Sequence, residues 1–408
     1  MKKRWIALVC VFCLLFSTAV AADGMVLYDE DGGEPLTELL AEDEAVWAAG
    51  TVPADTSALQ VHAKGAVLMD QGSGQVLFEQ NSHARVPIAS VTKVMTLLLV
   101  MEELDGGRLK WEDTVTCSPT AASMGGSQIW LEPGEIMTVE ELVKAAAVVS
   151  ANDACAALGE HISGTIEAFV ARMNARAAEL GMQDTLFKDC SGLDDSGYSC
   201  AYDVAVMSRE LMKHTAIQKF TTIWMDSLRG GASQLVNTNK LVRHYKGATG
   251  LKTGTTAAAG HCLSATARRD GTAFVAVVLG CDTTDHRWSG ARALLDYGFA
   301  NFTAYTPAAE SLSLSPVKVL GGQLTEVMPA AETPVPLLLK KGTETQVEAR
   351  VELAADVEAP VVKGQVLGRW KVMLGEEMLA EYPLRAVCEV PETTLPWAYR
   401  LLIDALLK

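Results

Sequence analysis

The stretch Pro87-Ile88-Ala89-Ser90-Val91-Thr92-Lys93-Val94-Met95-Thr96 opens an apolar segment that continues to Leu104. Beyond Pro87 this segment contains neither Gly nor Pro and is rich in helix formers, so it predicts a helix over residues 91–104. Ser90 and Lys93 stand three positions apart, and such residues share one helix face. The lysine amine can therefore reach the serine hydroxyl, which also gains from the positive end of the helix dipole.

A serine hydroxyl is a weak nucleophile until a base removes its proton. A lysine amine can be that base when burial and neighbouring charge lower its pKa. The Ser-x-x-Lys pattern occurs by chance in many chains, so its weight depends on what accompanies it. In this chain we interpret Ser90 and Lys93 as a candidate nucleophile and base because two further polar motifs follow.

The second motif, Ser150-Ala151-Asn152, follows a predicted helix over residues 139–149 and offers a hydroxyl for proton relay and an amide for substrate. The third, Lys252-Thr253-Gly254 with Thr255 after it, combines a cation and a hydroxyl with a glycine that permits close backbone approach. Taken alone, the second motif is more simply a helix cap and the third an ordinary turn. In this order the three motifs together are specific.

The surrounding pattern predicts one α/β domain over residues 58–305. A hairpin is predicted around Gln71-Gly72-Ser73-Gly74, because β-type runs flank this turn on both sides. Further predicted elements are helices over 166–180, 201–214 and 291–299 and a buried strand over 273–279.

The composition changes after this domain. Residues 306–395 carry many Val, Thr and Pro in short alternating runs, which predicts a small all-β domain, a sandwich or barrel. Residues 396–408 form a predicted amphipathic helix with one polar stripe of Arg400, Asp404 and Lys408. At about 1.5 Å per residue this helix is too short to cross a bilayer. We expect it to lie on the membrane surface, with docking on the β domain or on a partner as the alternative.

The N-terminus predicts export. Residues 1–21 combine Lys2, Lys3 and Arg4, an apolar run and a small-residue cleavage site, as a signal peptide does, with a retained membrane anchor as the alternative. Residues 22–57 are acidic and interpreted as a flexible leader, with a short helix over 36–47 as the alternative. The chain is therefore expected to be secreted across the cytoplasmic membrane, to its outer face or the cell-wall space.

Charge and cysteine content exclude several classes of function. The formal net charge of −16 opposes nucleic acid as a partner, because phosphate binding needs clustered Lys and Arg. Without its signal peptide the chain keeps seven scattered cysteines, which favours buried thiols over a disulfide framework. Metal-binding patterns are missing from the mature sequence, so we predict no metal and no cofactor.

The three motifs and their flanking segments resemble low-molecular-weight penicillin-binding proteins, the D-alanyl-D-alanine carboxypeptidases of the serine peptidase S11 family. The likeness extends to Gly126-Ser127-Gln128-Ile129-Trp130-Leu131 and to Gly250-Leu251-Lys252-Thr253-Gly254-Thr255-Thr256. It covers about residues 60–305, and more loosely the β-rich region and the final helix. It implies a β-lactamase/transpeptidase-like domain, an antiparallel sheet with a helical lobe. Where the family pattern has Asn-Pro-x-Gly-Leu, this chain has Asp189-Cys190-Ser191-Gly192-Leu193.

The resemblance also implies a role for each motif residue. Ser90 would form the acyl-enzyme with Lys93 as base, and Ser150 would relay the proton. The expected substrate-binding residues are Asn152, Lys252, Thr253, Gly254, Thr255 and Arg287, with the amides of Ser90 and Thr255 as the oxyanion hole. The expected partners are peptidoglycan stem peptides and, as covalent inhibitors, β-lactam antibiotics.

The resemblance implies a D-Ala-D-Ala carboxypeptidase, and three alternatives stay open. A DD-endopeptidase on crosslinked peptidoglycan would use the same site. A non-catalytic lactam- or peptidoglycan-binding sensor would acylate without turnover. A β-lactamase is disfavoured, because class A enzymes carry a Glu followed four residues later by Asn. Between the second and third motifs the glutamates are followed at that spacing by other residues, namely Gly164, Ala171, Gln183 and His214.

Overall fold

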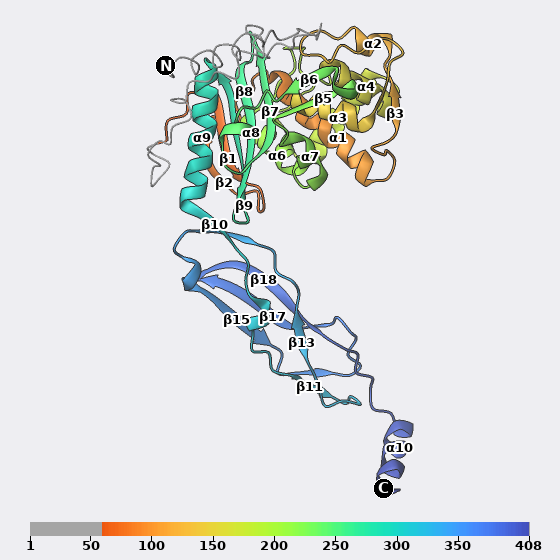
Figure 1. The fold of residues 1–408 in the computed structure, drawn as a ribbon. Helices are drawn as coiled ribbons and strands as arrows, with labels where there is room; N and C mark the ends of the chain where they lie inside the picture. The colour runs from red at the N-terminus through yellow and green to blue at the C-terminus, as the bar shows by residue number, and fades with distance from the viewer. Residues whose placement is uncertain (1–58, 408) are drawn as a thin grey trace, which may run out of the picture.

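The structure, a computed structural model, describes residues 59–407, which form two domains followed by a terminal helix (Figure 1). The predicted signal peptide (1–21) and acidic leader (22–57) lie outside the described residues.

A five-stranded antiparallel sheet forms the centre of the first domain, in the order β2-β1-β9-β8-β7. The predicted hairpin is confirmed as β1 and β2, and the predicted buried strand as β9. Strand β1 pairs with β9 through Ala66 and Val278, so the first and last strands of the domain meet at the centre of the sheet. The strands are β1 (Gly65–Asp70), β2 (Val76–Gln80), β7 (Ala248–Thr256), β8 (Gly260–Arg269) and β9 (Thr272–Cys281).

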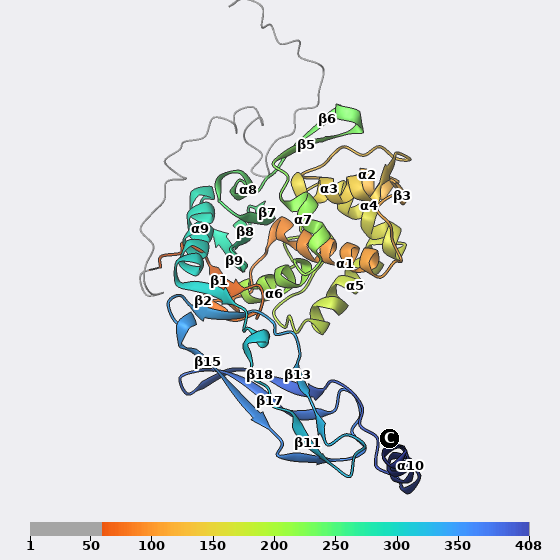
Figure 2. The same ribbon diagram turned by 60° about the horizontal axis from the view of Figure 1, so that its bottom comes forward.

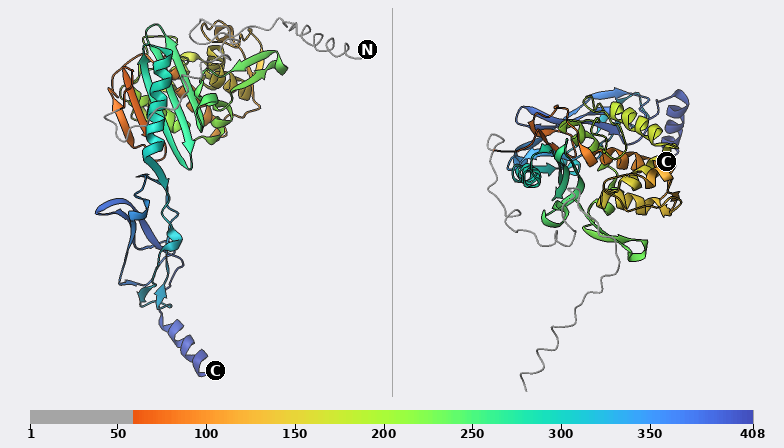
Figure 3. Two further views of the ribbon diagram at one scale, coloured as in Figure 1. Left: turned by 60° about the vertical axis from the view of Figure 1, so that its left-hand side comes forward. Right: turned by 90° about the horizontal axis from the view of Figure 1, so that it is seen from above.

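Both faces of this sheet are covered, which explains the unbroken apolar run of β9. Val275 and Val277 pack among the helices of the lobe, whereas Phe274 and Ala276 pack against α9 (Thr284–Asn301). Figure 3 shows α9 lying along one face of the sheet.

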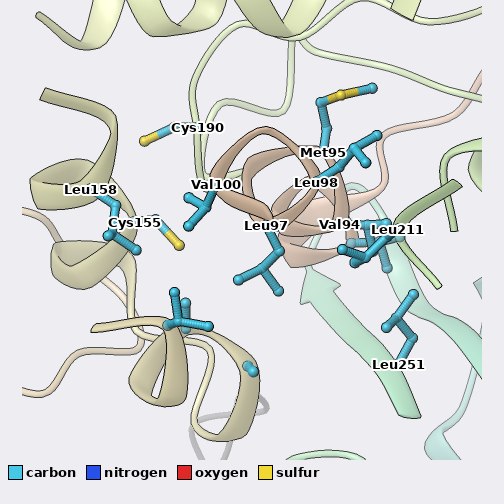
Figure 4. Packing of buried hydrophobic residues seen from close by; sticks show 14 of the residues in the cluster. Val94, Met95, Leu97, Leu98, Val100, Cys155, Leu158, Cys190, Leu211 and Leu251 are labelled. Carbon is cyan, nitrogen blue, oxygen red and sulfur yellow. The ribbon is translucent and has the colours of Figure 1, made fainter. Parts of the chain in front are cut away.

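The helical lobe is inserted in the chain between β2 and β7 and covers the other face (Figure 2). Its core is built around α1, whose Val94, Leu97 and Leu98 pack near Leu211 and Leu251 (Figure 4). Its helices are α1 (Lys93–Asp105), α2 (Pro119–Ala122), α3 (Val139–Val148), α4 (Asn152–Ser163), α5 (Ile166–Glu179), α6 (Ala201–Leu211), α7 (Gln218–Thr221) and α8 (Leu241–His244). Two short strand pairs complete it, β3 (Thr114–Thr116) with β4 (Ile136–Thr138) and β5 (Met225–Leu228) with β6 (Ser233–Val236).

Two helix boundaries differ from the prediction in ways that matter for the site. The helix expected from Val91 starts as a 3-10 turn over Ala89–Thr92 and becomes α-helical only at Lys93. Helix α9 begins at Thr284, seven residues before the predicted Ala291, because Thr283 caps it by accepting a hydrogen bond from the His286 amide.

The second domain is all-β, as predicted. A four-stranded sheet has the order β13-β18-β17-β15 and a three-stranded sheet the order β12-β11-β16, while β10 pairs with β14. Strand β10 lies just before the boundary expected at residue 306; it pairs with β14, while its Phe302 packs in the core of the first domain. The strands are β10 (Phe302–Tyr305), β11 (Val317–Leu320), β12 (Glu326–Val327), β13 (Pro329–Ala331), β14 (Leu337–Lys340), β15 (Val347–Leu353), β16 (Asp356–Glu358), β17 (Val366–Leu374) and β18 (Glu377–Ala386).

The chain ends in α10 (Leu395–Leu406), at the end of the β domain remote from the first domain (Figure 1). None of its described residues is buried; Leu395 is 88% exposed and Leu407, just after the helix, 80%. The alternative of docking on the β domain is therefore wrong for this structure. Among residues 59–407, every helix is too short or too polar to span a bilayer.

The cysteines lie mostly inside the first domain. Among residues 59–407 no disulfide joins the seven of them, and six are buried, in agreement with the expected buried thiols.

Candidate active site

Ser90 and Lys93 lie on the 3-10 turn that leads into α1. Residues i and i+3 eclipse one another in a 3-10 helix, and the Nζ atom of Lys93 lies 2.7 Å from the Oγ atom of Ser90. Lys93 is fully buried, whereas Ser90 is half-buried and reachable. Ala89, just before the candidate nucleophile Ser90, has a φ of 47°, a left-handed conformation that costs a non-glycine residue energy and is common at functional sites. The turn thus leaves Ser90 accessible to a ligand and buries Lys93 beneath it.

A loop from a distant part of the sequence holds the lysine in place. The Nζ atom of Lys93 also donates to the carbonyl of Ser191 at 2.9 Å. Within the loop, the Asp189 carboxylate accepts from the amides of Ser191 at 2.7 Å and Asp194 at 2.6 Å, and from that of Gly192. Asp189, which stands where the family pattern has Asn, therefore organises this loop in the present chain.

Gly192 brings the same loop against the 3-10 turn over Ala89–Thr92 (the nucleophile turn, after its candidate nucleophile Ser90). A Cβ atom on Gly192 would lie 1.9 Å from the carbonyl oxygen of Ala89, and its φ is +86°. Only glycine fits this close approach.

Ser150 and Asn152 occupy the link between α3 and α4. Ser150 is fully buried with a φ of 64°, and its Oγ atom has no hydrogen-bond partner among the described residues. The Nδ2 atom of Asn152 donates to the Gly125 carbonyl at 2.7 Å. The Oδ1 atom of Asn152 is buried and likewise without a partner in the described chain. Two buried polar atoms without partners in the described chain are what a site that binds a polar ligand would contain.

Asp153 fixes the loop that Asn152 touches. Its carboxylate accepts from the amides of Ile129 and Leu131 at 3.0–3.2 Å and from that of Ala154 at 2.9 Å. Burial nevertheless raises the pKa of Asp153 above its ordinary value. These hydrogen bonds hold the loop of residues 126–131 in place beside Asn152.

The third motif lies on β7, the edge strand of the sheet. Lys252 and Thr253 are buried, and Thr253 donates from its Oγ1 atom to that of Thr238 at 2.8 Å. Gly254 faces the nucleophile turn: a Cβ atom there would lie 2.7 Å from the Ile88 carbonyl and 2.9 Å from the Ser90 amide. The absence of a side chain at Gly254 lets β7 approach the serine backbone directly.

Arg287 reaches the site from the first turn of α9. It is buried, and its Nη1 atom donates to the Oγ1 atom of Thr255 at 3.0 Å. Side chains alternate along a strand, so Thr253 and Thr255 point to the same side of β7. Arg287 is therefore placed on the side of β7 that carries the two threonine hydroxyls.

The structure thus joins all three sequence motifs at one edge of the sheet. Gly254 touches the Ser90 turn, and the loop carrying Gly192 lies against that turn. The methyl of Leu193 lies next to Gly126, which in turn lies against Asn152.

Sequence reasoning missed several residues that support this arrangement. Thr238 connects α3 to β7. Its amide donates to the Val148 carbonyl at the end of α3 at 3.0 Å, and its hydroxyl accepts from Thr253 on β7. Its signal in the sequence, one threonine in a polar stretch, is too weak to single it out. The carbonyl of Ser191 leaves no sequence signal at all, because every residue has one.

One side-chain group in the described part of the chain could hold a metal ion. Candidate ligand atoms of His83, Asp184 and Cys200 lie within 4.8 Å of one another. However, Arg85 already donates to Asp184 at 3.0 Å, and burial raises the pKa of the Cys200 thiol to about 12. Both features disfavour a cation there.

Two family comparisons match this chain. Residues 52–283 match the peptidase S11 family, D-alanyl-D-alanine carboxypeptidase. Residues 302–392 match the C-terminal domain of penicillin-binding protein 5.

Individual proteins agree. The chain is 42% identical over 336 residues to D-alanyl-D-alanine carboxypeptidase DacF of Bacillus subtilis, which covers 81% of this chain and 86% of the relative. It superposes on penicillin-binding protein 5 from Haemophilus influenzae with a TM-score of 0.71 and 31% identity, over 84% of this chain and 100% of the other. A third similar structure is penicillin-binding protein D2 from Listeria monocytogenes in its ampicillin-bound form, with 31% identity and a TM-score of 0.52 over 59% of this chain and 99% of that protein.

Proposed function

The chain belongs to the peptidase S11 family and is a serine-type D-alanyl-D-alanine carboxypeptidase, and we propose that it works through an acyl-enzyme on Ser90. The observation that carries this proposal is the 2.7 Å contact between the Nζ atom of Lys93 and the Oγ atom of Ser90. Lys93 takes the proton of the serine hydroxyl as this oxygen attacks the carbonyl between the two D-alanines. The proton then passes to the leaving amine of the terminal D-alanine, with Ser150 as the relay.

Negative charge develops on the carbonyl oxygen during the attack. The proposed donors to it are the backbone amides of Ser90 and Thr255. The close approach of Gly254 to the Ser90 amide supports this pairing, because it draws β7 up to the nucleophile turn. Since amides in a folded site are already oriented, little reorganisation accompanies the reaction.

Substrate binding uses the remaining motif residues. The strand edge of β7 is open to pairing with an extended peptide, as edge strands are. We assign the terminal carboxylate to Thr253, Lys252 and Arg287, and the peptide amides upstream to the Oδ1 atom of Asn152. The buried, unpartnered state of that atom in the described chain supports its assignment as an acceptor for the substrate.

The decisive experiment replaces Ser90 by Ala. Fluorescent penicillin should no longer label the protein covalently, and a pentapeptide ending in D-Ala-D-Ala should lose no D-alanine by mass spectrometry. Ser289→Ala, which changes an exposed serine on α9, is the matched control and should keep both activities. Labelling of the Ser90→Ala protein on another serine would refute the nucleophile assignment.

We further propose that α10 attaches the exported enzyme to the outer face of the membrane. The apolar side chains of this helix are exposed rather than packed on the β domain, and its polar residues form a single stripe. An amphipathic helix of this kind lies in the membrane interface.

Truncation tests the attachment. Removal of Pro396–Lys408 should move the protein from the membrane fraction to the soluble fraction with its carboxypeptidase activity intact. A truncated protein that stays in the membrane fraction after signal cleavage would contradict the role of α10.

A further inference from the structure

We propose that Asp195 is a specificity-determining residue that binds a positively charged side chain on the stem peptide, on the residue just before the D-Ala-D-Ala pair. This inference rests on the proposed function and extends it from the reacting bond to the upstream part of the substrate. The ligand chemistry is a primary ammonium group on a flexible side chain, as in a diamino acid.

The first step is the position of Asp195. It is exposed on the loop that also carries Asp189 and Ser191, and its Oδ1 atom accepts from the Oγ1 atom of Thr256 at 2.6 Å. Thr256 is the last residue of β7. Asp195 therefore lies across from the end of the strand that the substrate is expected to pair with.

The second step is the direction of the bound peptide. Along β7, the proposed carboxylate-binding Thr253 comes first, the oxyanion-hole residue Thr255 comes next, and Thr256 follows. A substrate with its carboxylate at Thr253 and its scissile carbonyl at Thr255 must continue towards Thr256. One residue in an extended chain advances about 3.3 Å, so the residue before the D-Ala pair passes the Thr256–Asp195 contact.

The third step is the chemistry of that place. Only one oxygen of Asp195 has a hydrogen-bond partner among the described residues, so the other can accept from an ammonium group. Leu193, 43% exposed on the same loop beside Gly126, can cover the methylene groups of a long side chain. An apolar support followed by a carboxylate suits an aminoalkyl side chain.

The neighbouring Asp194 provides a matched comparison. Its carboxylate accepts from the amide of Ser196 at 2.9 Å and from the hydroxyl of Ser196 at 2.6 Å, within its own loop. These bonds lower the pKa of Asp194. Both aspartates are exposed and adjacent in sequence, but among the described residues only Asp195 of the two makes a hydrogen bond to β7.

The experiment compares two pentapeptides ending in Lys-D-Ala-D-Ala, one with the lysine amine free and one with it acetylated. The wild type should hydrolyse the free-amine peptide with a kcat/KM about three- to tenfold higher, as expected for one exposed ion pair with a hydrogen bond. Asp195→Asn keeps an acceptor for Thr256 and should remove this preference by slowing only the free-amine peptide. Asp194→Asn should keep the preference, and added salt should reduce it in the wild type.

Three outcomes would overturn the proposal: no preference in the wild type, a preference that survives in Asp195→Asn, or equal loss in Asp194→Asn. In each of these the acetylated peptide is still hydrolysed and penicillin still labels Ser90, so the proposed function stands. A wild type that hydrolyses neither peptide would instead refute the proposed function and this inference with it.

Discussion

A Cβ atom on Gly254 would lie 2.9 Å from the amide nitrogen of Ser90. The substitution Gly254→Ala should therefore push β7 away from the nucleophile turn and misalign the two oxyanion donors. Loss of one such donor typically lowers kcat about 100-fold or more. We expect the rate of acylation by fluorescent penicillin to fall by at least tenfold. Circular dichroism should show an intact fold, and an unchanged acylation rate would contradict the proposed contact between β7 and the turn.

The substitution Lys93→Arg tests whether Lys93 is the base that accepts the proton of Ser90. Arginine keeps the positive charge and approximate length, but it cannot accept a proton in a protein. Stopped-flow acylation should slow by several orders of magnitude, whereas slow labelling through the intact Ser90 remains. If Lys93→Arg acylates at a near-native rate, the base must be another group.

The substitutions Arg287→Ala and Thr253→Ala test whether these residues bind the terminal carboxylate of the substrate. Loss of one charge-assisted contact costs about 1.5–3 kcal/mol, or about ten- to a hundredfold in kcat/KM. The loss should be large for a peptide with a free terminal carboxylate and much smaller for the same peptide amidated at its C-terminus. Equal losses of kcat/KM on both peptides would show that these residues stabilise the fold and do not bind the terminal carboxylate.

A substitution at Glu103 tests how much its ion pairs stabilise the helical lobe. Glu103 is buried on α1 and accepts from the Nε atom of Arg108 at 2.6 Å and from Arg172. The hydrogen bond from Arg108, and then that from Arg172, lower the pKa of Glu103. A carboxylate with a lowered folded-state pKa stabilises the protein above its unfolded pKa, and this contribution disappears as the pH falls through the folded pKa.

At pH 7 the substitution Glu103→Gln should therefore lower the free energy of unfolding by about 1–2 kcal/mol. In acid the difference from the wild type should vanish. Denaturant unfolding at both pH values measures this, with Glu112→Gln, an exposed carboxylate, as the control. A difference that persists at low pH would mean that Glu103 acts through packing.

The sequence predicted the three motifs and the outline of the fold better than the contacts that align the motifs with one another. Ser90 with Lys93 and Lys252 with Thr253 were recognisable because their chemistry depends on residue type and short spacing. The Ser191 carbonyl and Thr238 act through positions that only the folded chain creates. The 3-10 turn was missed because helix propensity cannot reveal the left-handed Ala89 that precedes it. Helix α4 was not predicted, because residues 150–152 were interpreted as a polar motif that follows the helix over 139–149, with a helix cap as the alternative.

The pairing of β1 with β9 has a consequence for the biosynthesis of this enzyme. The two strands at the centre of the sheet come from opposite ends of the first domain, with the whole helical lobe between them. Such contacts between distant chain segments form late and slowly. A chain that emerges N-terminus first cannot close its sheet before β9 has been synthesised. Until then β7 is not joined through β8 and β9 to β1, and the completed sheet does not yet hold β7 against the turn that carries Ser90. Covalent capture of a lactam should thus report completed folding of the entire domain, and an immature chain should escape inactivation.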